Sequence, residues 1–139
     1  MKGITIDEMK IGDSASFTKT ITDTDIYLYA GITGDFNPAH INQVEAEKSV
    51  FGRRVAHGML SAGLISAVLG TTLPGPGTIY TGQELRFVKP VFVGDTITAT
   101  LTVAELIPEK NRAKFETVCT NQNGEVVITG MATVMPPKA

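Results

Sequence analysis

The chain contains one cysteine, Cys119, in 139 residues, so no disulfide can form within it. Such sparing use of cysteine is typical of a reducing compartment, and we therefore expect a cytoplasmic protein. Basic runs are also missing and the net charge is −2, which argues against a nucleic-acid partner. No apolar run approaches the ~20 residues of a membrane span. The charges in MKGITIDEMKIGD stand where a signal peptide needs its apolar stretch. We expect no membrane partner.

The composition indicates a globular protein. Hydrophobic residues make up 42% of the chain and charged residues 19%, which is too apolar for a disordered segment. A chain of this length can bury roughly two thirds of its unfolded surface. We expect one domain, residues 1–139, with no linker or internal repeat.

Charge is absent from the middle of the chain. No Asp, Glu, Lys or Arg occurs between Val55 and Gln83. Within this window, residues 59–69 are apolar nearly all round, which predicts a buried helix because a surface helix shows a polar face. The predicted helix is too short to cross a bilayer. Gly70 is its expected C-cap, and PGPG at 74–77 prevents continuation.

After this helix the hydrophobic period changes from 3.6 to 2. The clearest alternation is TITATLTVAEL, in which apolar side chains alternate with threonines and predict a half-buried strand. Asn123-Gly124 is a strong hairpin signal. Strands are predicted at residues 14–22, 82–92, 96–106, 112–120 and 125–135. The predicted inward residues are Leu85, Phe87, Ile97, Ala99, Leu101, Val103, Ala113, Phe115, Thr117, Cys119, Val126, Ile128, Ala132 and Val134.

Two short helices complete the pattern. One is predicted at residues 23–34, capped by Thr22 or Asp23, and another follows Asn42 within NQVEAEKSVF. A buried helix needs an element that wraps it, and a curled antiparallel sheet is the simplest solution. The prediction is an α+β hot-dog fold, with about five antiparallel strands around the central helix.

Polar residues suited to catalysis gather in two loops. The first, residues 33–40, carries Asp35, Asn37 and His40, with Pro38 restricting the backbone. A rigid loop with an acid and an imidazole can hold two proton-transfer groups in fixed relation. In the second loop, Gly58 precedes the buried helix, where a backbone N–H suits a developing oxyanion.

Structural roles can also explain these residues. Asp35 and Asn37 fit an Asx-turn and a helix cap, and His40 fits a structural hydrogen bond. His57 is interpreted as a hydrogen-bond donor to a loop carbonyl. Two histidines with the distant Cys119 do not form a zinc set, so no metal is expected. Ser61 and Ser66 lack a nucleophile-elbow context and are expected to bond back to the preceding turn.

The stretch Tyr29-Ala-Gly-Ile-Thr-Gly-Asp-Phe-Asn-Pro-Ala-His40, with Ala46 six residues later, resembles the hydratase motif of the MaoC-like family. The best-known members of this family are the (R)-specific enoyl-CoA hydratases. The resemblance continues through RVAHGMLSAGLIS and LPGPGTIYTGQELRFVKPVFVGD to the last strand, and covers essentially the whole chain. Ala39 departs from the larger aliphatic residue usual in the family, so altered packing is expected there.

The resemblance implies a reaction and a role for individual residues. Members hydrate a trans-2-enoyl thioester reversibly to the (R)-3-hydroxyacyl thioester, without cofactor or metal. Asp35 and His40 would hold and activate the water, with Asp35 favoured as proton acceptor and His40 as donor. Gly58 N–H would bind the enolate oxygen, and Asn37 and Pro38 would shape the loop. The remaining positions match the family's acyl pocket: Ser66, Leu69 and Val134.

The carrier and the assembly are further expectations. The family resemblance implies a homodimer, with the acyl-CoA near its interface. An acyl carrier protein is the alternative carrier, as in a 3-hydroxyacyl-ACP dehydratase, and a non-catalytic acyl-thioester-binding protein is a second alternative. Four cations are candidates for a phosphate-bearing arm, or else solvated surface: Arg53, Arg54, Arg86 and Lys89.

Overall fold

A computed structural model of the chain describes residues 2–139. Its helices are α1 (Asp23–Thr33), α2 (Pro38–Ile41), α3 (Gln43–Glu47) and α4 (Gly58–Thr71), and its 3-10 turns are η1 (Ile6–Glu8) and η2 (Pro108–Lys110). Its strands are β1 (Ser14–Thr20), β2 (Ile79–Phe87), β3 (Thr96–Ile107), β4 (Arg112–Thr120) and β5 (Val126–Met135). Within residues 2–139, no helix is both long and apolar enough to cross a membrane.

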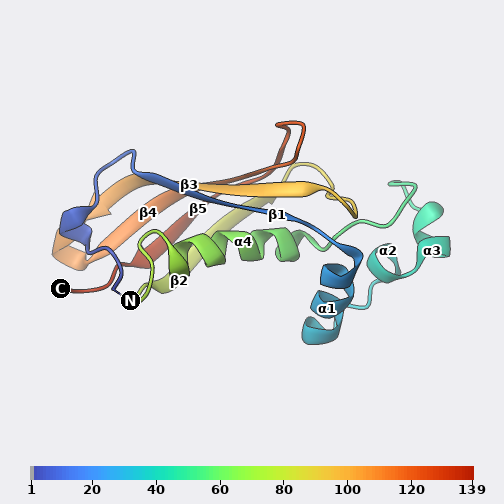
Figure 1. Cartoon of the computed structure of the whole chain (residues 1–139), viewed down its shortest axis with the longest axis horizontal. Helices are drawn as coiled ribbons and strands as arrows, with labels where there is room; N and C mark the ends of the chain where they lie inside the picture. The colour runs from blue at the N-terminus through green and yellow to red at the C-terminus, as the bar shows by residue number, and fades with distance from the viewer. Residues whose placement is uncertain (1) are drawn as a thin grey trace.

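The strands form one antiparallel sheet in the order β1-β3-β4-β5-β2. Figure 1 shows α4 running along one face of this sheet, while α1, α2 and α3 gather beyond the end at which α4 begins. The sheet of five strands confirms the predicted architecture. β2 forms one edge of the sheet, so its outer backbone groups have no strand partner within the described chain.

The alternation predicted for β3 is confirmed. Its inward side chains are at most 1% exposed: Ile97, Ala99, Leu101 and Val103. Its outward threonines pair with hydroxyls of β1, as in the 2.8 Å contacts Thr18–Thr98 and Thr20–Thr96. The two faces of β3 therefore carry different interactions: dispersion and burial inside, and cross-strand hydroxyl pairs outside.

Helix α4 is less enclosed than its composition predicts. Leu64, Ile65 and Val68 are buried against the sheet, but Met59 is 53% exposed, and a stripe of small residues on the same side is open. That stripe consists of Gly63, Ser66 and Gly70. A single curled sheet covers one side of a helix, so the prediction of little exposure all round is wrong for the single chain.

Gly70 is not the C-cap that was predicted. The helix continues through Gly70 to Thr71, and the N–H groups of Thr72 and Leu73 both donate to Val68 O at 2.9 Å. These bonds close the last turn without a left-handed glycine. The glycines with positive φ lie in the following PGPG turn, at 75 and 77.

Several predicted strand and helix bounds need correction. β2 starts at Ile79 and ends at Phe87, before Pro90. In β5, a register shift between Cys119 and Thr120 puts Val126 opposite the outward Thr120, so Val126 does not share the inward face of Ile128. This irregularity inserts one residue, Val127, and one extra residue reverses the alternation. α3 ends at Glu47, and its neighbour α2 occupies what was predicted as loop.

Candidate active site

The loop after α1 is held by its own polar groups. Gly34 ends α1 in the left-handed region with φ 79°, and its N–H donates to Ala30 O at 2.8 Å. Asp35 Oδ1 accepts a 3.3 Å bond from Asn37 N–H. Asn37 Oδ1 accepts a 3.0 Å bond from Ala39 N–H and caps α2, whose first residue is Pro38. The predicted Asx-turn and cap are therefore both present, and they leave the second carboxylate oxygen of the exposed Asp35 free for solvent or substrate.

His40 presents one ring nitrogen to the site. Its Nδ1 lies 2.6 Å from Val55 O. Because a carbonyl oxygen only accepts, Nδ1 carries a hydrogen. The neutral ring then has its lone pair at Nε2, which is the nitrogen left available to the cavity that His40 lines. A protonated His40 keeps the Val55 bond and presents an N–H at Nε2 instead.

His57 joins the start of α4 to the loop that carries Asp35, residues 33–40. It is 2% exposed, and its Nε2 lies 3.0 Å from Asp35 O, which makes Nε2 the protonated nitrogen. Its ring stacks on His40 with centroids 3.9 Å apart and contacts Tyr29 at 4.6 Å. The interpretation of His57 as a donor to a loop carbonyl is confirmed. The loop it binds is the one that carries Asp35.

Gly58 begins α4, and its N–H lies at the positive end of the helix dipole. Within residues 2–139, this N–H has no hydrogen-bond partner. A Cβ on Gly58 would lie 2.6 Å from ring carbons of Phe87. A side chain at this position would force the Phe87 ring to move, because the aromatic ring of β2 lies directly against the helix start.

A cavity of about 460 Å³ brings these groups together. Asp35, His40 and Gly58 all line it, with His57 and Ser61 in its wall. Its apolar lining comes mainly from two loops and the end of β2: Phe51, Val55, Ala56, Met59, Phe87, Val88, Pro90, Val91 and Ile128. The cavity can thus seat an apolar ligand whose reactive end lies against a carboxylate, an imidazole and a free N–H.

Ser61 was not predicted to take part in the site. It is fully buried, and among residues 2–139 its Oγ has no hydrogen-bond partner, in contrast to the expected bond to the preceding turn. His57 Nδ1, one helical turn earlier, is also buried and has no partner in the same described part of the chain. The feature of the sequence that could have identified Ser61 is its position four residues after His57, in a segment without charged residues.

The three residues predicted for the acyl pocket do not line this cavity. Ser66 lies on the open side of α4, while Leu69 and Val134 are 1% and 0% exposed in the core. Ser66 and Leu69, although three residues apart, therefore have different surroundings. Their role in acyl binding stays a prediction.

Asp35, His40 and His57 place potential metal ligands within 4.8 Å of one another. The two rings are stacked with 30° between their planes, and each has one nitrogen committed to a carbonyl. An imidazole lone pair lies in the ring plane, so the remaining nitrogens do not converge on one ion at about 2.0–2.1 Å. The geometry favours proton transfer by this cluster over metal binding.

Comparisons with known proteins find relatives that match nearly the whole chain. The MaoC like domain family matches residues 8–127. An (R)-specific enoyl-CoA hydratase of Rhodospirillum rubrum is 59% identical over 131 residues, which cover 94% of this chain and 90% of the relative. A 3-hydroxybutyryl-CoA dehydratase of Methylorubrum extorquens is 46% identical, with coverage of 95% and 83%. The structure of an unliganded R-hydratase from Pseudomonas aeruginosa superposes with a TM-score of 0.93 at 44% identity, covering 99% of this chain and 88% of that one.

Proposed function

Because the chain belongs to the MaoC-like family, we propose that it is an (R)-specific enoyl-CoA hydratase. The reaction adds water across the double bond of a trans-2-enoyl-CoA and gives the (R)-3-hydroxyacyl-CoA, and it is reversible. The observation that carries this proposal is the meeting of Asp35, His40 and the Gly58 N–H in one cavity. The family resemblance implies that this reaction needs no cofactor.

Asp35 and His40 divide the two proton transfers. Water attacks C3 as the Asp35 carboxylate accepts one of its protons, and the π electrons of the double bond move toward the thioester oxygen. The enolate then collapses, and protonated His40 delivers the proton from Nε2 to C2. Val55 O supports this state because it accepts from Nδ1 whether His40 is neutral or charged. The proton left on Asp35 returns to His40 through solvent, which restores the site.

The Gly58 N–H stabilises the charge that develops on the thioester oxygen. It lies at the start of a 14-residue helix, so the dipole and the N–H act in the same direction. A donor of this kind contributes roughly 3 kcal/mol to the transition state. A side chain at position 58 would collide with the ring of Phe87, so glycine keeps the start of the helix accessible.

The test is the loss of crotonyl-CoA absorbance in the native protein and in two folded variants. Asp35→Ala and His40→Ala should each lose at least ~10² in turnover, the low end for positioned acid–base groups. Glu116→Gln is the matched control, since Glu116 lies exposed on β4. Near-normal turnover in both variants, or an (S) product on chiral analysis, would contradict the proposal.

The carrier is tested with the same assay. Crotonyl-CoA is the expected substrate, and crotonyl-ACP tests the alternative of a 3-hydroxyacyl-ACP dehydratase. Faster turnover of the ACP thioester would favour that alternative, whereas binding without turnover of either would favour a non-catalytic acyl-thioester protein.

We also propose a cytoplasmic location. The lone, fully buried Cys119 supports it.

The second part of the proposal is a homodimer. The edge strand β2 exposes Ile79 and Tyr80, with 57% and 38% exposure, and an unpaired edge is a ready site for another copy. The open stripe of α4, with Met59 at its start, also lacks a cover in the single chain. Light scattering should give twice the chain mass, and a monomer across the working concentration range would contradict this assembly.

Ser66, Leu69 and Val134 are proposed to line the acyl pocket, on the basis of the family resemblance. Leu69→Ala should then raise activity on C6 and C8 relative to C4 enoyl-CoA, by about fourfold per methylene if each is fully desolvated. If Leu69 serves only the core, its truncation will cost ~2–5 kcal/mol of stability with an unchanged chain-length ratio. That second result would remove Leu69 from the pocket and leave the catalytic loop untouched.

A further inference from the structure

The four cations considered for a phosphate-bearing arm have different surroundings. Arg54 is paired with Asp23, and Lys89 with Glu125. Arg86 lies on the other face of the sheet, in a groove that it shares with Glu84 and Glu116. Arg53 is exposed, and within residues 2–139 it has no carboxylate partner.

Arg53 is nevertheless held in place. Its guanidinium carbon lies 3.5 Å from the centroid of the Phe92 ring. The backbone supports this contact, because Val55 and Phe92 form an antiparallel bridge. A guanidinium stacked on an aromatic ring keeps its N–H edges free, which leaves them able to bind a planar or tetrahedral anion.

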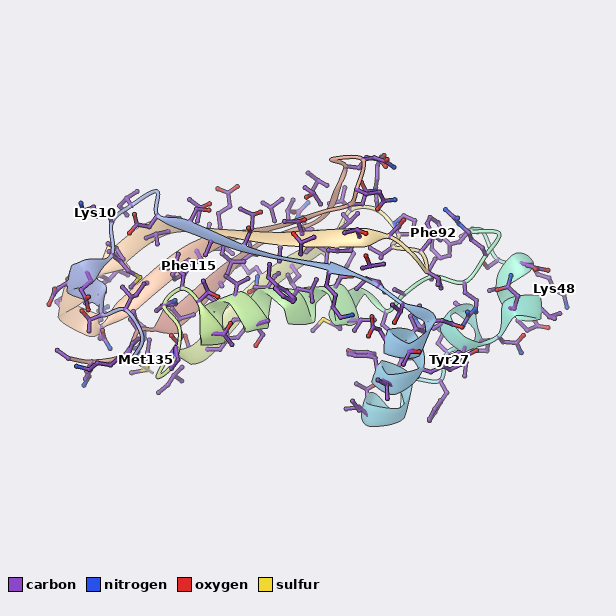
Figure 2. All side chains as sticks on the ribbon, in the orientation of Figure 1. Lys10, Tyr27, Lys48, Phe92, Phe115 and Met135 are labelled. Carbon is purple, nitrogen blue, oxygen red and sulfur yellow. The ribbon has the colours of Figure 1, made fainter. Side chains whose placement is uncertain are left out.

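The stacked pair lies beside the cavity. Phe51 and Val55 flank Arg53 in the chain and line the cavity, as do Lys89 and Val91 just before Phe92. Figure 2 shows Phe92 at the end of the molecule that carries α2 and α3, beyond the start of α4. A carrier arm that leaves the cavity on this side would pass the stacked pair.

We propose that Arg53, stacked on Phe92, binds a phosphate group of the thioester's carrier arm. This inference rests on the proposed hydratase function and names the part of the substrate that the catalytic loop does not touch. Arginine suits the role because its fork of donors matches phosphate oxygens and its charge does not depend on pH. Lys89 adds a second cation at the rim, but its contact with Glu125 opposes its use by an anion.

The competing explanation is that Arg53 only clamps its own loop against Phe92. A structural clamp would affect every substrate equally, whereas a phosphate site affects only substrates that carry phosphate. Crotonyl-pantetheine, which has the same reactive end and no phosphate, separates the two.

The experiment measures both binding and turnover. Calorimetry gives the Kd of CoA, 4′-phosphopantetheine and pantetheine, and the absorbance assay compares crotonyl-CoA with crotonyl-pantetheine. In Arg53→Gln, the Kd of CoA and the KM of crotonyl-CoA should rise about tenfold, while kcat stays the same. The KM and kcat of crotonyl-pantetheine should not change. Arg53→Lys should recover part of the loss, and Arg86→Gln, a cation on the other face, should match the native protein.

The ligand series also identifies the phosphate. If Arg53 makes phosphopantetheine bind more tightly than pantetheine, it contacts the phosphate that coenzyme A shares with carrier proteins. If only CoA binds more tightly, Arg53 contacts a phosphate at the nucleotide end of CoA. The proposal would be overturned if the native protein bound CoA and pantetheine with equal affinity. It would also be overturned if Arg53→Gln raised the KM of both thioesters by the same factor. If the native protein hydrates neither thioester, the proposed function fails, while the binding series still decides the role of Arg53.

Discussion

Replacing His57 tests how the helix start controls the catalytic loop. His57 Nε2–H donates to Asp35 O at 3.0 Å, and this partly buried bond joins a buried ring to the backbone of the proposed proton acceptor. Glutamine places an amide nitrogen the same number of bonds from Cα as Nε2, and asparagine places one at the position of Nδ1. His57→Gln can therefore keep the bond to Asp35, whereas His57→Asn cannot.

The expected magnitudes follow from that difference. The loss of such a partly buried hydrogen bond costs about 0.5–1.5 kcal/mol, and if this cost falls on the positioned transition state it equals roughly a 2- to 13-fold loss of kcat. His57→Asn should show this loss in the crotonyl-CoA assay with little change in KM, and His57→Gln should retain most of the turnover. Both variants lose the stacking on His40, so the unfolding midpoint of each should fall, and it should fall further in His57→Asn, which also loses the bond to Asp35.

A result that refutes this reasoning is easy to recognise. If His57→Gln loses as much turnover as His57→Asn, the ring acts through something other than its bond to Asp35. The same conclusion follows if His57→Asn is as active as the native enzyme. A change confined to the pH profile of His57→Gln would instead assign the effect to the stacked neighbour, His40.

Four further outcomes are expected. Gly58→Ala should lose at least about tenfold in turnover, because its Cβ meets the Phe87 ring at 2.6 Å and displaces the N–H donor, and adding Phe87→Ala should restore part of the activity. Asp25→Asn should cost about 1 kcal/mol at pH 7 in urea unfolding. The bonds from Lys19 and Thr22 lower the pKa of Asp25, so this difference should shrink as the pH falls below the usual value of about 3.9. Burial raises the pKa of Cys119 to about 11, so a thiol reagent should label it only after unfolding. Turnover should survive dialysis against a chelator, since the stacked imidazoles do not converge on an ion.

The fold could be predicted where the pattern was regular. The alternating threonines of β3, the Asn123-Gly124 turn and the charge-free helix each predicted an element that is present. The errors lie where one residue breaks the regularity. The irregularity at Val127 reverses the face of Val126, and only the pairing with β4 determines this. Gly70 matched a C-cap by residue type, but hydrogen bonds to Val68 O place the C-cap two residues later, at Thr72.

The residues of the loop could be predicted from a short motif, but the residues that pack against this loop could not. Asp35 and His40 lie five residues apart on one loop, so local sequence brings them together. His57 and Ser61 reach the same cavity from α4, and no local pattern shows which side of that helix meets the loop. For the same reason Leu69 was grouped with Ser66, although the sheet covers one and leaves the other open.

The apolar character of α4 all round and its open stripe can be reconciled by a second subunit. A helix buried by one chain alone would carry polar residues opposite the sheet. Here the uncovered side carries Met59, Gly63, Ser66 and Gly70, none of them charged, and small residues allow close approach of another surface. The sequence of α4 therefore suits two covers, the sheet of its own chain on one side and a partner on the other. Because the stripe begins at Met59, which also lines the cavity, a partner on this side would lie next to that cavity.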